Sequence, residues 1–373
     1  MIYFDSAATT FQKPPQVAEA VGEAMRTMSS PGRGGYEAAM TAADTVFACR
    51  LALAELFHMK DPSRVVFTMN ATHALNLAIK SLVPPGERVV ISGYEHNAVT
   101  RPLTALHADV RIAAGPLFRP DVVVEAFDRE IQPGTKAVIC SHISNVFGFI
   151  QPVETVAKLC RERGVPLIID ASQSAGILPL DLEQLGAACI AFPGHKGLYG
   201  PQGTGVLLCG ELPLQPLIEG GTGSNSRLQV MPEFLPDRLE AGTHNVPGIA
   251  GLLAGVQYVK QRGTEAILHW ERQLTAFLAE GLREIPWLRV LSQPELPHQA
   301  GVLSVVPEGM DPEELGERLA QRGIAVRAGY HCAPLAHHTA GTLESGTVRL
   351  SVSDLNTLQE ACCCLDAFHA CRP

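Results

Sequence analysis

Several features are missing from this sequence, and each absence argues against a class of protein. The 373-residue chain has no window that approaches the roughly 18 consecutive apolar residues of a membrane-spanning helix, so we expect no membrane partner. Residues 1–5 lack a basic stretch followed by an apolar one, and we therefore expect no signal peptide and a cytoplasmic location. Positive charge is in deficit, since the formal net charge is −9, which argues against nucleic acid as a partner.

Cysteine is present, but not in the spacing of a metal site. No two of the ten cysteines form a C-x-x-C pair. Without a signal peptide, free thiols in a reducing compartment are expected rather than disulfides. Apolar surroundings predict that five cysteines belong to the core: Cys49, Cys140, Cys160, Cys189 and Cys209. Four more gather near the C-terminus, where neighbours on a helix would point apart, so we expect no metal there: Cys362, Cys363, Cys364 and Cys371.

Repeats and dinucleotide motifs are also missing. No G-x-G-x-x-G motif follows the first expected strand, which argues against a dinucleotide-dependent dehydrogenase. There is neither an internal repeat nor a low-complexity tract. A hydrophobic content of 46% over 373 residues is instead typical of a globular protein with a sizeable core, long enough for one large and one smaller domain.

The sequence does contain an alternation of short apolar runs and helical stretches. The apolar runs are expected to be buried strands: 64–68, 88–92, 110–113, 137–142, 166–169, 189–192 and 205–209. Helical spacing lies between several of them: 71–82, 98–106, 153–163 and 182–185. This order predicts an α/β fold whose mainly parallel seven-stranded sheet carries helices on both faces. Ligands of such sheets bind at the carboxyl ends of the strands.

The flanking segments complete a two-domain interpretation. Helical patterns precede the alternation at 17–28 and 38–58 and follow it at 247–262 and 265–285. A smaller α+β domain is predicted beyond residue 288, from these elements: strands 302–306, 325–327 and 347–351, a helix at 312–321 and a terminal helix. We place the large domain at 15–258 and the small domain at 1–14 together with 259–373.

One lysine occupies a glycine-dense stretch directly after an apolar run. Lys196, flanked by His195, is either a solvated lysine in a turn or an amine whose pKa is lowered by burial for Schiff-base chemistry. Asp170 ends the preceding apolar run, and buried carboxylates are rare unless they are paired. Pyridoxal phosphate (PLP) needs such a pair, because lysine forms an imine with its aldehyde while aspartate keeps its pyridine nitrogen protonated. A structural ion pair is the alternative.

Polar residues also follow other expected strands. Thr72 stands at a helix start, which can cradle a phosphate or simply be capped. His96 and Asn145 follow two further strands, and a lone histidine there is often structural. Cys332 lies in a polar loop with neighbouring histidines and an arginine, where a thiol is exposed and its thiolate favoured. Arg349, inside an apolar strand, is suited to gripping a carboxylate with both arms of its guanidinium.

Taken in order, these motifs resemble a family. The matching segments are Asp170-x-x-Gln173, Gly-His-Lys at 194–196, Glu-Ala-Gly-Thr at 240–243, Arg-Ala-Gly-Tyr-His-Cys at 327–332, and Arg349. Together they resemble the class V aminotransferase-like, fold-type I PLP enzymes, in the branch of cysteine desulfurases and selenocysteine lyases. The resemblance runs from Phe4 to Asn356, which is nearly the whole chain.

The resemblance implies PLP as the cofactor and a role for each matching residue. The implied cofactor-binding residues are Lys196 for the Schiff base, Asp170 and Gln173 for the ring nitrogen and phenolic oxygen, His96 for stacking on the ring, Thr72 and His195 for the phosphate, and Thr243 from the other subunit of a homodimer. The implied substrate-binding residues are Asn145 and Arg349. Lys196, His96 and Cys332 would be catalytic, with Cys332 as the nucleophile that takes the sulfur.

The implied reaction converts L-cysteine to L-alanine and leaves a persulfide on Cys332, from which a protein acceptor would take the sulfur. His331 or Arg327 would help to favour the Cys332 thiolate. Other PLP chemistries stay open: a lyase acting on L-selenocysteine, an aminotransferase, or a β-eliminating lyase. A PLP-binding sulfur-delivery partner with little turnover of its own is the alternative outside catalysis.

Three departures from the family pattern bear on substrate preference and turnover. Pro193 stands where many relatives have a hydroxyl residue, so one phosphate ligand is expected to be missing. The loop between Cys332 and Arg349 is slightly longer than in the best-known members. The segment 351–356 lacks the aromatic residues that the family pattern leads us to expect.

Overall fold

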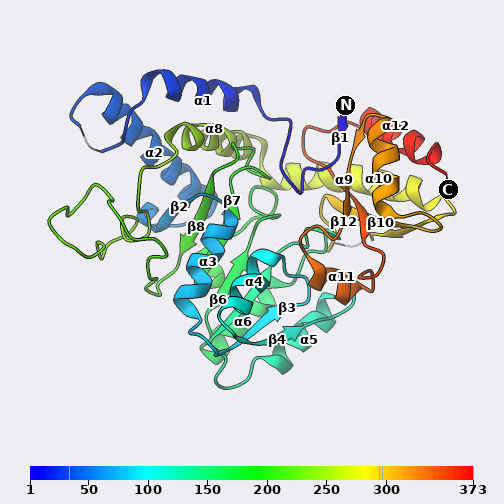
Figure 1. Ribbon diagram of the computed structural model, residues 1–373, viewed down its shortest axis with the longest axis horizontal. Helices are drawn as coiled ribbons and strands as arrows, with labels where there is room; N and C mark the ends of the chain where they lie inside the picture. Colours follow the sequence, from blue (N-terminus) through cyan, green and yellow to red (C-terminus); the bar gives the residue numbers. More distant parts are fainter. Residues whose placement is uncertain (33, 294, 296, 373) are drawn as a thin grey trace.

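The computed structural model of the chain describes residues 1–32, 34–293, 295 and 297–372 (Figure 1). Its larger sheet has the order β2-β8-β7-β6-β5-β3-β4. The strands are β2 (Val65–Thr68), β3 (Arg88–Ser92), β4 (Asp109–Ala113), β5 (Ala137–Ser141), β6 (Leu167–Asp170), β7 (Cys189–Pro193) and β8 (Gly205–Cys209). β8 runs antiparallel to both of its neighbours, and the other pairs are parallel, which confirms the predicted sheet.

Helices cover both faces of this sheet. One face packs against α3 (Ala71–Leu82) and α4 (Asn97–Ala105). The opposite face packs against α2 (Glu37–Leu56), α5 (Pro120–Glu130), α6 (Val153–Arg163) and α8 (Val246–Arg262). Strand residues supply the two cores alternately, as in β5, where Val138 joins one cluster and Ile139 the other. A strand buried on both faces becomes a continuous apolar run, which explains why the sequence located these strands.

A second, antiparallel sheet of order β12-β13-β10-β9 forms the smaller part of the molecule. Its strands are β9 (Leu288–Leu291), β10 (Val302–Pro307), β12 (Arg327–Gly329) and β13 (Thr347–Ser351). The helices α9 (Thr264–Arg283), α10 (Pro312–Gln321) and α12 (Leu358–His369) enclose a separate core with it. The N-terminus joins this part, because β1 (Ile2–Tyr3) pairs with β11 (Ile324–Ala325), and both chain ends lie there in Figure 1.

Two helices, α5 and α11 (Pro334–Ala340), were not predicted from the sequence. Val123, Ala126 and Phe127 of α5 nevertheless have the spacing of a helical apolar stripe. α1 (Pro15–Thr27) packs on α8, while α7 (Leu182–Leu185) and the 3-10 turn η1 (Pro62–Arg64) connect larger elements. None of the described helices is long and apolar enough to cross a bilayer.

The boundary placed between residues 258 and 259 falls inside α8, which continues to Arg262. α9 begins two residues further on, at Thr264. Its Ile267 still belongs to the large core, while Leu274, Leu278 and Leu282 belong to the smaller one. The division into 15–258 and 1–14 with 259–373 stays a prediction.

Candidate active site

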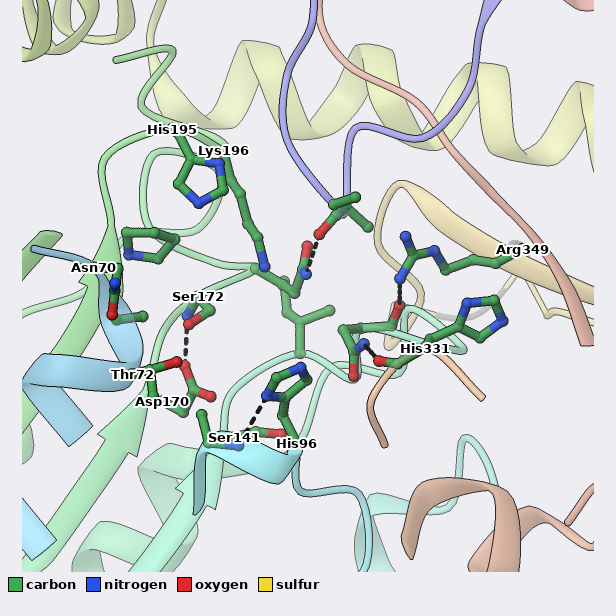
Figure 2. A pocket seen from close by; sticks show the side chains of 18 of the residues that line it. Asn70, Thr72, His96, Ser141, Asp170, Ser172, His195, Lys196, His331 and Arg349 are labelled. Atoms are coloured by element: carbon green, nitrogen blue, oxygen red, sulfur yellow. Dashed lines mark hydrogen bonds between the residues drawn. The ribbon is translucent and has the colours of Figure 1, made fainter. Parts of the chain in front are cut away.

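The carboxyl ends of β2, β3, β5, β6 and β7 open onto a cavity of about 190 Å³ (Figure 2). Residues of the large sheet, the N-terminal segment and the smaller sheet all contribute to its wall. The sequence-predicted residues that line it are Thr72, His96, Asn145, Asp170, Gln173, His195, Lys196 and Arg349. The fold therefore gathers most of the predicted site at the strand ends, where an α/β sheet binds its ligands.

Lys196 reaches into this cavity from the loop after β7 (Figure 2). Burial lowers the pKa of its amine to about 8, opposed by the carboxylate of Asp170 and assisted by the guanidinium of Arg349. Within the described part of the chain, this amine forms no hydrogen bond or ion pair. An amine with a lowered pKa and no fixed partner is suited to attack on an aldehyde.

Asp170 is the last residue of β6 and is only 4% exposed. Its Oδ1 accepts the backbone N–H of Ser172 at 2.9 Å. Among the described residues, nothing hydrogen-bonds its second oxygen, so one carboxylate oxygen is available to a protonated ring nitrogen. The Asp170 carboxylate is therefore suited to pair with the protonated nitrogen of a pyridine ring.

His96 caps the N-terminus of α4 at the cavity wall. Its Nδ1 accepts the backbone N–H of Ala98 at 3.0 Å, so the neutral ring carries its proton on Nε2. Burial lowers the pKa of His96 to about 4, against the opposing effect of Asp170. The ring is therefore uncharged at neutral pH and can lie against an aromatic cofactor without a desolvation penalty.

The N-terminus of α3 and the His195 ring form an anion cradle. Asn70 caps the helix by accepting the N–H of His73 at 2.9 Å. The backbone N–H groups of Ala71 and Thr72 have no acceptor within the described residues, and both residues line the cavity. Such N–H groups at the positive end of a helix dipole bind phosphates. With Lys196 for an aldehyde and Asp170 for a ring nitrogen, this donor set fits PLP.

His195 completes that cradle as a neutral ring. Its Nδ1 lies 2.9 Å from the Thr9 hydroxyl oxygen. Burial lowers the pKa of His195 to about 4, and the neighbouring charges of Lys196 and Lys13 lower it further. His195 can thus offer a hydrogen bond to a phosphate, but not a full positive charge.

Arg349 is 1% exposed and holds the opposite side of the cavity. Its Nη2 lies 2.5 Å from Asp5 Oδ1, and its Nη1 donates to the carbonyl oxygen of Asn145 at 2.9 Å. The guanidinium Nε is buried and has no partner among the described residues. A buried arginine that lines the cavity suits a carboxylate ligand.

Cys332 lies in the loop between β12 and α11 and is exposed, as expected. It does not line the cavity itself, but its neighbours His331 and Arg327 do. The backbone is left-handed at both His331 (φ 50°) and Cys332 (φ 56°), a conformation that side chains of this kind rarely adopt. Two contacts hold the turn: Asn145 Nδ2 donates to the His331 carbonyl at 2.9 Å, and the Asn97 N–H donates to the Cys332 carbonyl at 2.8 Å.

His331 and Arg327, the two residues expected to favour the Cys332 thiolate, differ in the charge that they can offer it. The His331 ring is 4% exposed, and its Nε2 lies 3.0 Å from the Thr347 hydroxyl oxygen. Burial lowers the pKa of His331 to about 2, so the ring is neutral over the physiological range. The cation beside the thiol is Arg327, whose Nη2 lies 4.0 Å from Cys332 Sγ.

The comparisons with known proteins agree with this geometry. A family model described as aminotransferase class-V matches residues 2–361. The chain belongs to this family.

Within this family, the individual relatives described below are named cysteine desulfurase. A protein named probable cysteine desulfurase from Mycolicibacterium paratuberculosis is 33% identical over 96% of this chain, which spans 54% of that relative's length. A second, from Methanothermobacter thermautotrophicus, is 32% identical over 96% of this chain and is itself covered to 92%. A solved structure described as the apo structure of a cysteine desulfurase from Thermococcus onnurineus superposes with a TM-score of 0.88 at 30% identity, covering 98% of this chain and 93% of that one.

The N-terminal segment of this class V family member builds part of the site that the sequence did not predict. Gln173 Nε2 donates to the Ala7 carbonyl at 2.9 Å, and Thr10 Oγ1 donates to the His195 carbonyl at 2.9 Å. Lys13 Nζ donates to the Gly200 carbonyl at 2.8 Å and so braces the lysine loop. The run of small residues near residue 7 was visible in the sequence, but nothing local indicated partners 166 to 187 residues away.

Thr243 is the predicted cofactor residue that the structure does not bring to the Lys196 cavity. It is exposed and lines a different cavity together with Glu240 and His244. A buried ion pair braces its loop, since Arg50 Nη2 lies 2.5 Å from Glu240 Oε2, and His244 Nε2 lies 2.9 Å from the same oxygen. Its assignment to the site of a second subunit stays a prediction.

Proposed function

We propose that this protein is a PLP-dependent cysteine desulfurase that converts L-cysteine to L-alanine and stores the sulfur as a persulfide on Cys332. One observation carries the proposal. The cavity combines an amine of lowered pKa at Lys196 with the buried carboxylate of Asp170, and an exposed thiol stands next to residues of its wall. The similarity to proteins named cysteine desulfurase supports the same assignment.

The cofactor would be held at three points. Lys196 would bind its aldehyde carbon, Asp170 its ring nitrogen, and the N–H groups of Ala71 and Thr72 its phosphate. Bound PLP withdraws electrons from the substrate α-carbon and so makes the α-proton acidic. The neutral His96 ring would flank the cofactor, and Gln173 would face its phenolic oxygen.

Substrate orientation would follow from Arg349 and Asn145. The buried guanidinium of Arg349 would receive the carboxylate of the amino acid and fix the α-hydrogen relative to Lys196. The Lys196 amine, with its pKa near 8, is able to take that proton at neutral pH and return it later. The enclosing N-terminal segment would exclude water from this exchange.

Sulfur transfer would then fall to Cys332. Its thiolate would attack the substrate sulfur, so that an S–S bond forms while the substrate's carbon–sulfur bond breaks. The bond electrons stay with the carbon skeleton, which is reprotonated to alanine, and the outgoing sulfur remains on Cys332. The Arg327 guanidinium, 4.0 Å from Sγ, would stabilise the thiolate. A protein thiol would be the natural acceptor, and a reducing compartment such as the cytoplasm suits a site built on a free thiol.

A homodimer would complete the site. Helix α2 buries Ala42, Val46 and Leu53 in the core but leaves a second apolar stripe, Met40, Phe47 and Leu51, exposed. A helix that is apolar on two sides needs a second surface to cover it, and a second copy would also bring Thr243 to the neighbouring cavity. Light scattering of the purified protein should give twice the chain mass, and Phe47→Glu should shift it towards the monomer.

The reaction is tested by following all of its products separately. Purified protein loaded with PLP and given L-cysteine should form alanine together with protein-bound persulfide. Pyruvate with free sulfide would indicate β-elimination, and a keto acid with amino-group transfer would indicate an aminotransferase. The same assay with L-selenocysteine compares the rates at which the two substrates form alanine. Failure to develop a Schiff-base absorbance with PLP would overturn the proposal altogether.

A further inference from the structure

A fully buried carboxyl group, Glu95, lies directly beneath the described site. Its Oε1 is 2.5 Å from the Ser92 hydroxyl oxygen and accepts the backbone N–H of Ser141 at 2.7 Å. Ser92 ends β3 and Ser141 ends β5, so one side chain joins two neighbouring strand ends. Ser141 is in turn the register partner of Asp170 in β6. Glu95 is also the residue before His96.

The surroundings of Glu95 are polar but offer no cation. Its Oε2 is buried without a hydrogen-bond partner, and among the described residues no lysine, arginine or histidine forms an ion pair with it. The amide of Gln151 closes the same cluster, since its Nε2 donates to Ser141 O at 2.7 Å and to Ser92 Oγ at 3.1 Å. Gln151 Oε1 is a second buried oxygen without a partner. Two orphaned acceptors in one cluster indicate a missing proton donor.

The electrostatics favour the acid form of the group. Burial raises the pKa of Glu95 to about 8, and the nearby Asp170 carboxylate raises it as well, while the hydrogen bond from Ser92 lowers it. Among the described residues, the Cys140 thiol also interacts electrostatically with Glu95, and burial raises the pKa of this thiol far above its usual range. Neither neighbour can supply the positive charge that a buried carboxylate requires.

We propose that Glu95 is a positioning residue that stays uncharged, ties the ends of β3 and β5 together under the cavity, and leaves the anionic role at that edge to Asp170. A proton on Oε2 turns an orphaned acceptor into a donor, for which Gln151 Oε1 is the candidate acceptor. The effect of Glu95 on cofactor binding rests on the proposed function, whereas its charge state does not. Experiments can therefore contradict either one without contradicting the other.

The charge state predicts a pH dependence of unfolding with a definite sign. The native pKa of Glu95 lies near 8 and the unfolded one near 4.5, so between these values the native protein binds one proton more than the unfolded chain. Stability therefore falls with rising pH, by about tenfold in the unfolding constant per pH unit. Glu95→Gln, which keeps the shape and supplies an N–H donor, removes this loss. The unfolding constant of the native sequence relative to E95Q should rise about 10³-fold from pH 4.5 to 8 and then level off. An identical pH dependence of the two proteins would overturn the proposal.

The matched control is Glu125→Gln, an exposed glutamate on α5, which should leave the pH dependence unchanged. Infrared difference spectra of the native sequence against E95Q test the proton directly, even if the variant proves hard to unfold reversibly. A carboxylic-acid C=O band at pH 6 that disappears in E95Q is expected, and a carboxylate band in its place would refute the assignment.

Cofactor affinity tests the positioning role. PLP titration of the apoprotein, followed by absorbance, should give E95Q an affinity within about threefold of the native sequence. Glu95→Ala, which removes the acceptor of the Ser141 N–H, should lose about tenfold or more. Equal losses in both variants would mean that the negative charge itself is required, and would contradict the neutral form.

Discussion

The two halves of the proposed site, the cavity at the strand ends and the Cys332 loop beside it, differ in how their reactive groups are held. At the strand ends, Lys196, His96 and Asp170 are enclosed, and burial lowers the pKa of the lysine and the histidine. On the opposite side, Cys332 is exposed on a left-handed turn beside an arginine. The enclosed half is built to control proton affinity, while the exposed half is built to pass a group to a partner. Each half can be altered while the other is left intact.

The largest effect is expected from Lys196→Ala, which removes the amine from the enclosed half. Alanine formation from cysteine should fall at least ~10⁴-fold, because both cofactor attachment and proton transfer are lost. The absorbance of the bound cofactor should lack its Schiff-base band. Lys60→Ala, at an exposed lysine far from the cavity, provides the control and should leave both readouts unchanged. A K196A variant that keeps the Schiff-base band would show that another amine binds the cofactor.

Cys332→Ser affects the exposed half alone. Persulfide should disappear and alanine formation should drop at least ~10³-fold, because the nucleophile is lost. The Schiff-base band should remain, since Cys332 does not line the cavity. Cys363→Ser, at another exposed thiol on α12, is the matched control. Unchanged alanine formation in C332S would show that sulfur abstraction by Cys332 is wrong.

Asp5→Asn tests how the N-terminal segment joins the two halves. It leaves Arg349, 1% exposed, without its anionic partner 2.5 Å away. Breaking one side of a buried ion pair should cost about 3 kcal/mol in the free energy of unfolding. Denaturant titration measures this. Asp121→Asn removes a surface ion pair with Arg119 and should cause no measurable change. Equal stability of D5N and the native sequence would show that the ion pair between the N-terminal segment and Arg349 does not stabilise the fold.

The smallest expected effect is the pH dependence of PLP uptake, which is set by Lys196 in the enclosed half. The pKa of the Lys196 amine is lowered from 10.5 to about 8, and only the unprotonated amine attacks an aldehyde. The rate of PLP uptake by the apoprotein should therefore rise about tenfold per pH unit below 8 and become flat above it. A rate that still rises beyond pH 9 would indicate an ordinary, solvated lysine.

The enclosed half was largely predictable from the sequence. Buried parallel strands read as apolar runs, and the polar residue after each run marks a carboxyl end, which located Asp170, His96 and Lys196. Fold class and strand order along the chain followed from the same pattern. Helix α11 was not predicted because it is short and lies between the left-handed turn at His331 and Cys332 and the glycine turn at Gly341.

The rest depended on long-range contacts that no local pattern encodes. Asp5 pairs with Arg349 across a separation of 344 residues, and Ala7 contacts Gln173 across 166. The neutral state of the His331 ring could not be predicted either, because its burial comes from packing against Thr347 and His337 and not from its neighbours in the chain. Glu95 was passed over because the residue next to it, His96, carried the recognisable motif.

A single-turnover experiment tests the central claim most directly. PLP-loaded protein is mixed with a substoichiometric amount of L-cysteine under anaerobic conditions, alanine is quantified, and the persulfide is located by peptide mass spectrometry. We expect alanine and persulfide in equal amounts, with the persulfide on Cys332. Alanine without persulfide, or a persulfide confined to Cys362 or Cys363, would contradict it.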